Sequence, residues 1–392
     1  MSFDDDPLDS RFCRCHPTPP LLPVELMKQP PLGCTRDDLD TPALCLDLDV
    51  MEANIRRISS ACQEHKVAWR PHVKGHKVGS IGKSEVDAGA LGLTCAKLAE
   101  AEIMAAAGVR DLLIANLVVG PHKVARLVEL RKIADPIVTV DNIAQVLPLS
   151  AAFKGSSTPL RVLIEVDIGL NRVGVGVGEP TLHLAQEIVK LPGVTFAGIM
   201  GYEGHLLTIA DRAEKEREIH AALSRLVETK QLLERHGVAC PIVSCAGSGS
   251  YQISITHPGI TEVQAGGAIF MDVFYREKCG VAGLDDALSI MATVVSRPAI
   301  DRAIIDAGRK TMNVEIAMPQ VKGRSDIIVE RLSAEHGQLK LEPSAYSLAI
   351  GDRLEIVPGY EDLTVVLHDQ FYGFRGERLS QIIPIEGRGK LT

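Results

Sequence analysis

Residues 67–77 read Val67-Ala-Trp-Arg-Pro-His-Val-Lys74-Gly-His-Lys77, an apolar, strand-like segment that runs into a group of basic residues. It is the first of eight strand-like segments separated by helix-like ones. Alternating strands and helices predict a parallel sheet of the α/β class, and eight strands predict closure into a (β/α)8 TIM-like barrel. The predicted strands are Val67–Lys74, Leu91–Ala96, Asp111–Asn116, Pro136–Asp141, Arg161–Gly169, Thr195–Tyr202, Ile242–Ser248 and Glu262–Gly267.

The rest of the chain predicts an N-terminal arm and a second domain. Residues 1–40 are rich in proline and charge, which disfavours long regular elements. Residues 41–49 alternate like a half-buried strand outside the barrel, which is expected to span residues 50–275. Together with residues 276–392 this strand is expected to form an antiparallel β domain. Its other predicted strands are Leu288–Val295, Ala303–Asp306, Asp326–Leu332, Arg353–Ile356, Leu363–Leu367 and Arg378–Ile383.

Composition narrows the class of protein. The 392 residues are 46% hydrophobic and 23% charged, with a net charge of −8, so the chain can bury a large core. It has no lysine- or arginine-rich run that would bind nucleic acid or anionic lipid, and no apolar stretch near the ~20 residues that span a bilayer. The acidic N-terminus does not resemble a signal peptide. The nine cysteines show no paired Cys-x-x-Cys spacing, which indicates reduced thiols and a cytoplasmic protein.

Lys74 is the first candidate for chemistry, because active sites of these barrels lie at the C-terminal ends of the strands. Arg70, His72, His76 and Lys77 surround it in the sequence. Neighbouring cations lower the pKa of a lysine, so we expect a neutral amine that can attack a carbonyl. A solvated basic turn is an equally good interpretation of this composition alone.

Two glycine-rich loops follow the seventh and eighth strands, where this fold often binds phosphate. Their backbone N–H groups can point at an anion, and the serine hydroxyls can donate as well. A single Gly-Ser-Gly turn is more often a plain loop, but two such loops at neighbouring strands favour a phosphate site. The candidate residues are Gly247, Ser248, Gly249, Ser250, Gln264, Gly266 and Gly267.

Further polar residues end the fifth and sixth strands. Asp167 and Arg172 follow the fifth, and Arg172 could bind an oxyanion or simply pair with Asp167 to fix a loop. The sixth ends in Tyr202, Glu203 and His205, of which at least one is expected to face the site. Tyr360 and Asp362, two positions apart, would lie on one side of a strand, or else in an ordinary turn.

As an ordered set, these motifs resemble the fold-type III pyridoxal phosphate enzymes, in particular the group of D-threonine aldolase, D-3-hydroxyaspartate aldolase and D-serine dehydratase. The resemblance covers about residues 41–385. The matching segments are residues 41–44, 70–77, 94–101, 114–120, 167–172, 262–266, 270–272, 306–308 and 367–369.

The resemblance implies that Lys74 forms a Schiff base with pyridoxal phosphate and that the loops Gly247–Ser250 and Gly266–Gly267 hold its phosphate. Arg172 matches an arginine that alanine racemases place beside the cofactor's phenolate oxygen. His72, Tyr202 and Gln264 complete the expected cofactor-binding set. A small amino acid is the implied substrate and a homodimer the implied assembly.

Two departures from the family pattern concern a metal and a base. Where relatives show a histidine followed two residues later by cysteine or aspartate, this chain has Tyr360 and Asp362, and a phenol is a poor ligand for divalent ions. Asp362 is therefore the metal candidate that remains, for Mg or Mn. Where the aldolases show Tyr-His-Gly, Glu203 stands in the middle position. Glu203 could be an oxygen ligand for Mg or Mn, or it could be the base for the substrate hydroxyl, with His205 as a further catalytic candidate.

The resemblance implies a lyase that cleaves the Cα–Cβ bond of a β-hydroxy-D-amino acid to glycine and an aldehyde. Dehydration of the same substrates, with release of ammonia, is the first alternative. A racemase is less favoured, since the chain lacks a match to the C-terminal tyrosine loop of alanine racemases. A non-catalytic cofactor carrier is disfavoured because a carrier has no evident need for the β domain.

Overall fold

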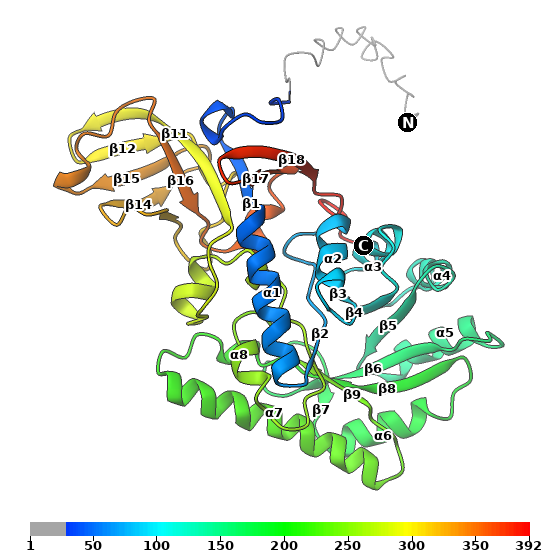
Figure 1. Ribbon diagram of the computed structural model, residues 1–392. Coiled ribbons are helices and arrows are strands. Elements are labelled where there is room, and N and C mark those ends of the chain that lie inside the picture. Colours follow the sequence, from blue (N-terminus) through cyan, green and yellow to red (C-terminus); the bar gives the residue numbers. More distant parts are fainter. Residues whose placement is uncertain (1–28) are drawn as a thin grey trace, which may run out of the picture. The chain divides into compact units, whose positions relative to one another are not determined.

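The computed structural model describes residues 29–392, so residues 1–28 of the predicted N-terminal arm lie outside the described part of the chain. Residues 32–392 form one unit that contains two sheets. Figure 1 shows the strands of one sheet among the helices and the strands of the other as a separate group. Helix α1 (Leu48–Glu64) runs from the second group to the first. No helix within residues 29–392 is long and apolar enough to cross a membrane.

The first sheet is the predicted barrel. Its strands pair in the order β2-β10-β9-β8-β6-β5-β4-β3, and every one of these pairs is parallel. A parallel bridge between His72 and Thr94 joins the two ends of this order and closes the barrel. The strands are β2 (Ala68–Trp69), β3 (Leu93–Cys95), β4 (Asp111–Leu117), β5 (Asp135–Val140), β6 (Leu160–Asp167), β8 (Val194–Met200), β9 (Ile242–Cys245) and β10 (Glu262–Val263), with the short β7 (Val175–Gly176) beside β6.

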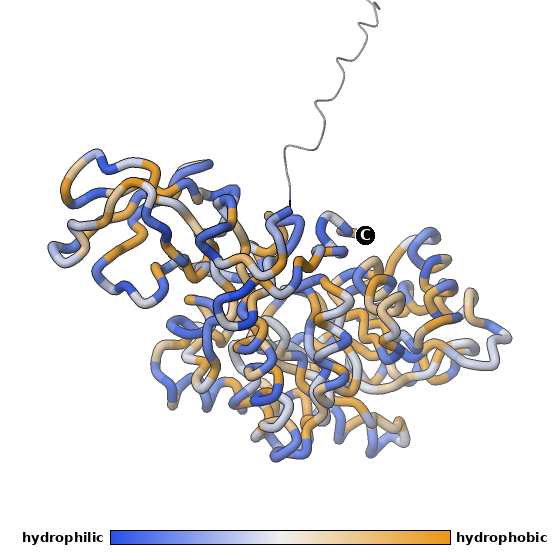
Figure 2. The backbone as a smooth tube through the Cα atoms, turned by 45° about the horizontal axis from the view of Figure 1, so that its top comes forward, coloured by the Kyte–Doolittle hydropathy of each residue, from blue (hydrophilic) through white to orange (hydrophobic). Residues whose placement is uncertain are grey.

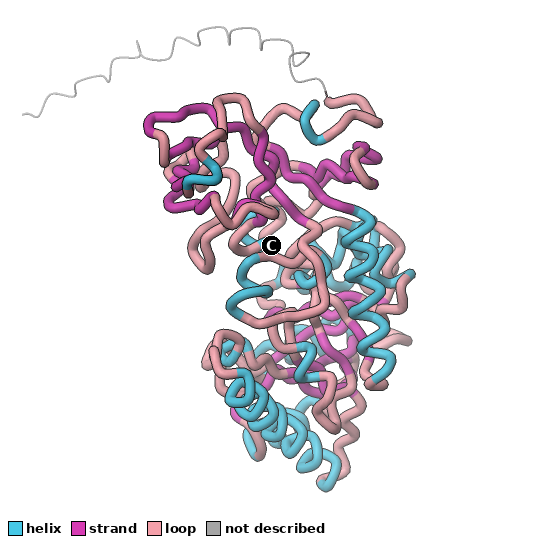
Figure 3. Tube along the Cα trace, turned by 60° about the vertical axis from the view of Figure 1, so that its left-hand side comes forward, coloured by secondary structure: helices cyan, strands magenta, loops and turns pink. Residues whose placement is uncertain are grey.

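Helices connect the barrel strands and lie outside them, as Figure 3 shows in cyan around magenta. The longest, α7, begins where Asp211 accepts a hydrogen bond from the Glu214 amide and ends two residues before Gly237, whose φ of 77° favours glycine. The helices that follow α1 are α2 (Gly79–Asp87), α3 (Leu98–Ala106), α4 (Pro121–Leu130), α5 (Ile143–Phe153), α6 (Glu179–Ile188), α7 (Arg212–Arg235) and α8 (Tyr251–Ser254). Figure 2 shows hydrophobic segments running through this part, with hydrophilic residues at its outer turns.

The second sheet confirms the predicted β domain but is not wholly antiparallel. Strand β1 pairs antiparallel with β11 and parallel with β17, which comes from near the C-terminal end of the chain. The sequence did not predict β13, β15 or β17. The strands are β1 (Ala43–Asp47), β11 (Leu288–Ala299), β12 (Arg302–Ile305), β13 (Gln320–Val321), β14 (Ile327–Leu332), β15 (Gly337–Leu341), β16 (Arg353–Val357), β17 (Gln370–Arg375) and β18 (Arg378–Pro384).

One predicted strand is wrong. Residues 363–367 were expected to be extended because they are rich in β-branched and apolar side chains, but helix α9 (Glu361–Val365) occupies most of the segment. The Asp272 carboxylate accepts a hydrogen bond from the Glu361 amide at 2.8 Å, and the Thr364 hydroxyl donates to the Tyr360 carbonyl. Asp272 is distant in the sequence, so a tertiary contact overrides the local preference for a strand.

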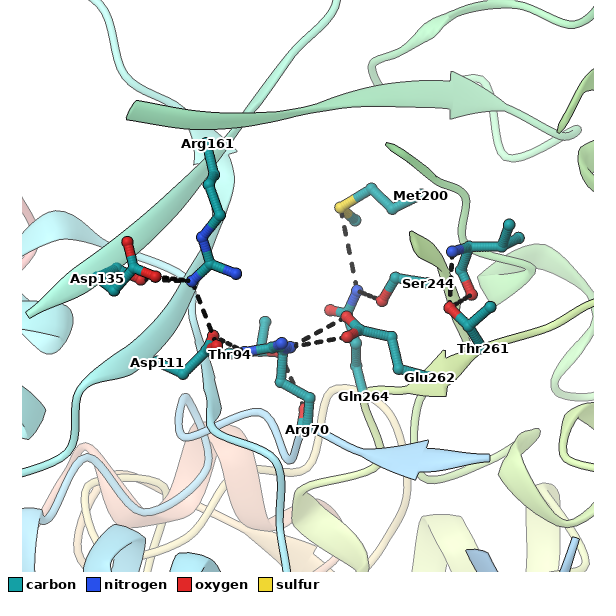
Figure 4. A network of polar contacts seen from close by, with 11 residues as sticks. Arg70, Thr94, Asp111, Asp135, Arg161, Met200, Ser244, Thr261, Glu262 and Gln264 are labelled. Atoms are coloured by element: carbon teal, nitrogen blue, oxygen red, sulfur yellow. Dashed lines mark hydrogen bonds and ion pairs between the residues drawn. The ribbon is translucent and has the colours of Figure 1, made fainter. Parts of the chain in front are cut away.

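A polar network connects residues near the starts of strands β4, β5, β6 and β10 with Arg70 (Figure 4). The Arg70 side chain is 1% exposed and donates through Nε to Glu262, at 3.0 Å, and through Nη1 to Asp111. Arg161 continues the network to Asp111 and Asp135. Buried charges are stable only when paired and hydrogen-bonded, and Arg70, which directly follows β2, meets this condition through Asp111 of β4 and Glu262 of β10.

Candidate active site

Lys74 lies in a turn after β2, which is shorter than predicted. Pro71 has no N–H to donate to a neighbouring strand, and the amides of His76 and Lys77 both turn back to the Val73 carbonyl, at 3.2 and 2.7 Å. The Lys74 side chain therefore reaches a cavity of about 310 Å³ beyond the C-terminal ends of the barrel strands. The predicted residues that line this cavity are His72, Lys74, Arg172, Tyr202, Gly247, Ser248, Gln264, Gly266 and Gly267.

The Lys74 ammonium forms an ion pair with the Asp362 carboxylate, which also accepts a hydrogen bond from the Tyr360 hydroxyl at 2.7 Å. Burial alone would lower the pKa of Lys74, but the charge of Asp362 raises it. Burial alone would raise the pKa of Asp362, but the charge of Lys74 and hydrogen bonds from Lys74 and Tyr360 hold it below its usual range. In this state the amine is protonated and the carboxylate ionised.

The expectation of a lowered lysine pKa is therefore wrong. It assumed that neighbouring basic residues would repel the Lys74 charge, yet three of them have acidic partners. Arg70 binds Glu262 and Asp111, His76 lies 3.4 Å from Glu85, and Lys77 binds the buried Glu100. The sequence showed the cations next to Lys74 but not these distant carboxylates.

His72 contacts the Lys74 backbone rather than a second charge. Its Nδ1 accepts a hydrogen bond from the Lys74 amide at 3.3 Å, while the ring lines the cavity. Burial and the charge of Lys74 lower the pKa of His72 to about 3. The imidazole is therefore neutral at physiological pH and offers an uncharged surface for a bound ring.

The two glycine loops form a cradle that fits a phosphate. Within residues 29–392, the amides of Ser248, Gly249, Gly266 and Gly267 donate to no protein acceptor. A Cβ atom at Gly266 would lie 2.0 Å from the His72 carbonyl oxygen. One at Gly267 would lie 2.1 Å from a Glu361 carboxylate oxygen. Glycine is thus required for the close approach, and unpaired amides at such a loop are suited to an anion.

Gly249 and Ser250 do not line this cavity. They face a second cavity of about 690 Å³ on the other side of the loop. The Ser250 hydroxyl accepts a hydrogen bond from the Gly247 amide at 3.3 Å, so it shapes the loop from within. The predicted phosphate residues therefore divide into those that line the main cavity and those that lie behind them.

Arg172 and Tyr202 lie together at the cavity wall. The Arg172 guanidinium is 5.8 Å from the centre of the Tyr202 ring, and its Nη2 is 3.4 Å from a Glu165 oxygen. Burial raises the pKa of Tyr202 to about 12, so the phenol keeps its proton. Asp167 does not pair with Arg172. Its carboxylate accepts hydrogen bonds from the amides of Gly169 and Asn171 and so fixes the loop after β6.

Glu203 and His205 do not reach the cavity, which corrects their prediction as catalytic groups. The Glu203 carboxylate is fully buried and accepts hydrogen bonds from the Ser254 hydroxyl at 2.7 Å and the Ala246 amide at 3.3 Å. His205 is exposed, beside Gly169. Strand β8 ends at Met200, and the backbone of Glu203 is not extended (φ −89°, ψ 31°), so its side chain turns toward Ser254 and Ala246 instead of the cavity.

The sequence also missed three polar residues that line the cavity, Asn116, Glu165 and Tyr275. Asn116 ends a predicted strand, and that position was a signal that could have found it, whereas Glu165 lies in the middle of the predicted strand Arg161–Gly169. Tyr275 belongs to a short π-helix, Phe274–Lys278, which the sequence did not predict. Burial raises the pKa of both Glu165 and Tyr275.

The side chains at Asp362 do not fit the Mg or Mn site left open by the sequence. The carboxylate is engaged by an ammonium and a phenol, neither of which is a ligand in its protonated form. Within residues 29–392 no group of three or more histidine, cysteine, aspartate or glutamate side chains is arranged to hold a metal ion.

Comparison with known proteins agrees with this geometry. The family model for the alanine racemase N-terminal domain matches residues 46–273, more than half of the chain, and that for a putative serine dehydratase domain matches residues 287–374. D-threonine aldolase of Arthrobacter sp. is 37% identical over 90% of this chain and 93% of its own. 3-Hydroxy-D-aspartate aldolase of Paracoccus denitrificans (strain Pd 1222) is 33% identical over 91% of this chain and 94% of its own.

The crystal structure of D-threonine aldolase from Filomicrobium marinum superimposes with a TM-score of 0.89 at 34% identity, covering 93% of this chain and 100% of that one. The fold, with its barrel and β domain, thus agrees along nearly the whole chain. The chain belongs to the alanine racemase-like, fold-type III family of pyridoxal phosphate enzymes.

Proposed function

We propose that this protein is a lyase that cleaves the Cα–Cβ bond of a β-hydroxy-D-amino acid to glycine and an aldehyde, with pyridoxal phosphate carried on Lys74. One observation carries the proposal: a lysine amine and a cradle of unpaired amides face the same cavity. These are the two groups that a cofactor with an aldehyde and a phosphate needs. The identity to the two aldolases supports the choice of reaction.

Each part of the cavity has a role in this proposal. Ser248, Gly266 and Gly267 would bind the phosphate, and the Lys74 amine would bond to the cofactor's carbonyl carbon. Arg172 would supply a positive charge from the cavity wall. When bound, pyridoxal phosphate supplies an electron sink for the pair left on Cα.

Asp362 is the base in this proposal, in place of Glu203. It lies beside Lys74 at the cavity and stays ionised because its pKa is lowered. Its carboxylate takes the proton of the substrate's β-hydroxyl, the Cα–Cβ electron pair moves to Cα, and the β carbon leaves as an aldehyde. Cα then takes up a proton to give glycine. The Tyr360 hydroxyl, bonded to Asp362, holds the carboxylate in position.

Dehydration is the second candidate, favoured by the match of residues 287–374 to a serine dehydratase domain. It requires an acid that assists the departure of hydroxide rather than a base at the hydroxyl. Product analysis separates the two. The purified protein is incubated with D-threonine, D-serine and D-3-hydroxyaspartate, with L-threonine as control. Glycine plus an aldehyde supports cleavage, whereas ammonia plus a 2-oxo acid without glycine supports dehydration.

Activity should survive removal of divalent metals, because Asp362 already has an ammonium and a phenol as partners. Prolonged dialysis against a chelator should leave the cleavage rate within about twofold of the untreated enzyme, since no metal acts as Lewis acid in this account. The measurement is rate against metal content of the same sample. A bound metal whose removal abolishes activity and whose return restores it would contradict this account.

The proposal also includes a homodimer in the cytoplasm, which is supported by the family resemblance and by the unpaired cysteines within residues 29–392. The mass of the assembly in solution, measured by light scattering, tests the dimer.

A further inference from the structure

Lys215 is a buried cation with no acidic partner. It lies in the first turn of α7 and is 5% exposed. Within residues 29–392 no carboxylate oxygen lies within 4.0 Å of its ammonium nitrogen. Instead Nζ donates to the carbonyl oxygens of Gly249, at 2.9 Å, and Cys279, at 2.6 Å.

This position is unfavourable for a lysine in two respects. Removing an ammonium from water without a counter-ion costs free energy, and a cation in the first turn of a helix is repelled by the helix dipole. Consistent with this, burial lowers the pKa of Lys215. A methionine would fill the same volume without either cost, so the charge calls for an explanation beyond folding.

The ammonium lies directly behind the anion-binding loop. Ser248 separates the two cavities, Gly247 lines the main one, and Gly249 and Lys215 line the other. A Cβ atom at Gly249 would lie 2.9 Å from the Cys279 sulfur. The loop therefore lies between Cys279 on one side and the main cavity on the other. Its Gly249 carbonyl accepts a hydrogen bond from Lys215.

We infer that Lys215 is a positioning residue for the cofactor phosphate, acting through the Gly249 carbonyl. By binding that carbonyl, the ammonium fixes the conformation in which the amides of Ser248 and Gly249 remain without a protein acceptor. Its charge is also the missing counter-charge to a phosphate dianion on the other side of the loop. This inference rests on the proposed function, since it assumes that the loop binds a phosphate.

The test compares two ligands that differ only in the phosphate. Apoprotein of the wild type, Lys215→Met and Lys215→Gln is titrated with pyridoxal phosphate and with pyridoxal. We expect Lys215→Met to lose about 10- to 100-fold in affinity for pyridoxal phosphate, the scale of one charge-assisted hydrogen bond, and to keep its affinity for pyridoxal. Lys215→Gln keeps a hydrogen-bond donor without the charge, so its affinity for pyridoxal phosphate should lie between those of the wild type and Lys215→Met.

Lys230→Met is the matched control, because Lys230 is on the same helix and pairs with Glu234. It should leave both affinities unchanged. Equal loss of both ligands in Lys215→Met would indicate a general structural role and overturn the inference, as would no loss of either. If the wild type binds pyridoxal phosphate normally in those cases, the proposed function stands. If the wild type binds none, the proposed function fails and this inference fails with it.

Discussion

Replacing Asp362 with asparagine should lower the rate of carbon–carbon cleavage by about 10²- to 10⁴-fold, the usual contribution of a general base. Asparagine has nearly the same shape but cannot take the β-hydroxyl proton. Cofactor binding should be retained, because the phosphate loops are untouched. The loss should therefore be seen in kcat, with the absorbance of bound cofactor preserved.

The pH profile gives a second readout. The base works only when ionised, so activity should fall as pH drops through its pKa. In the protein without cofactor, the Lys74 ammonium and the Tyr360 hydroxyl hold the pKa of Asp362 below the ordinary aspartate value of about 3.9. When Lys74 carries the cofactor this ammonium charge is lost and burial raises the pKa, so the fall in activity should come at a higher pH than the pKa of Asp362 in the protein without cofactor. Asp362→Glu should restore part of the rate, and Tyr360→Phe should cost less than Asp362→Asn. If Asp362→Asn loses the cofactor and the rate to the same extent, Asp362 is a counter-ion of Lys74 and not the base.

Replacing Arg70 with methionine should lower the free energy of unfolding by about 3–5 kcal/mol. The change leaves the Glu262 carboxylate, which is 2% exposed, without its partner inside the barrel. It also removes one partner of Asp111. The measurement is denaturant-induced unfolding of the apoprotein, followed by circular dichroism.

A double variant separates the pair from the packing. Arg70→Met with Glu262→Leu removes both charges and should recover much of the loss, since an apolar pair of similar size is often as stable as a buried ion pair. Lys132→Ala is the control, because Lys132 and Glu129 are 63% and 69% exposed. It should change stability by no more than about 1 kcal/mol. If Arg70→Met also lowered the free energy of unfolding by no more than about 1 kcal/mol, the network would contribute little to stability.

The barrel could be predicted from the sequence because its strands are buried on both sides and appear as apolar runs between helices. Strand β17 could not, since Gly373 interrupts a short segment that pairs with β18 on one side and, on the other, with β1 from the other end of the chain. Helix α9 depends on Asp272, a residue that no local pattern connects to Glu361. Local patterns therefore predict elements whose stability is local or whose burial is complete.

The site, too, was predicted only in part. Glycine loops and strand-end residues such as Lys74 and Arg172 were identified by their order along a barrel whose geometry brings strand ends together. The side-chain directions of Tyr202 and Glu203 were not, because both residues follow the end of β8, where the regular alternation of a strand no longer sets them. The partners of His76 and Lys77 come from other elements, so the charge state of Lys74 could not be derived from its neighbours.

The central claim is that Lys74 carries the cofactor in this cavity. Its most direct test is reduction of the holoprotein with borohydride, followed by peptide mapping of the cofactor-labelled lysine by mass spectrometry. Our account predicts a single label on Lys74, absent in Lys74→Ala and retained in Lys83→Ala, which changes an exposed lysine. A label on another lysine, or a wild-type protein that takes up pyridoxal phosphate without any label at Lys74, would contradict it.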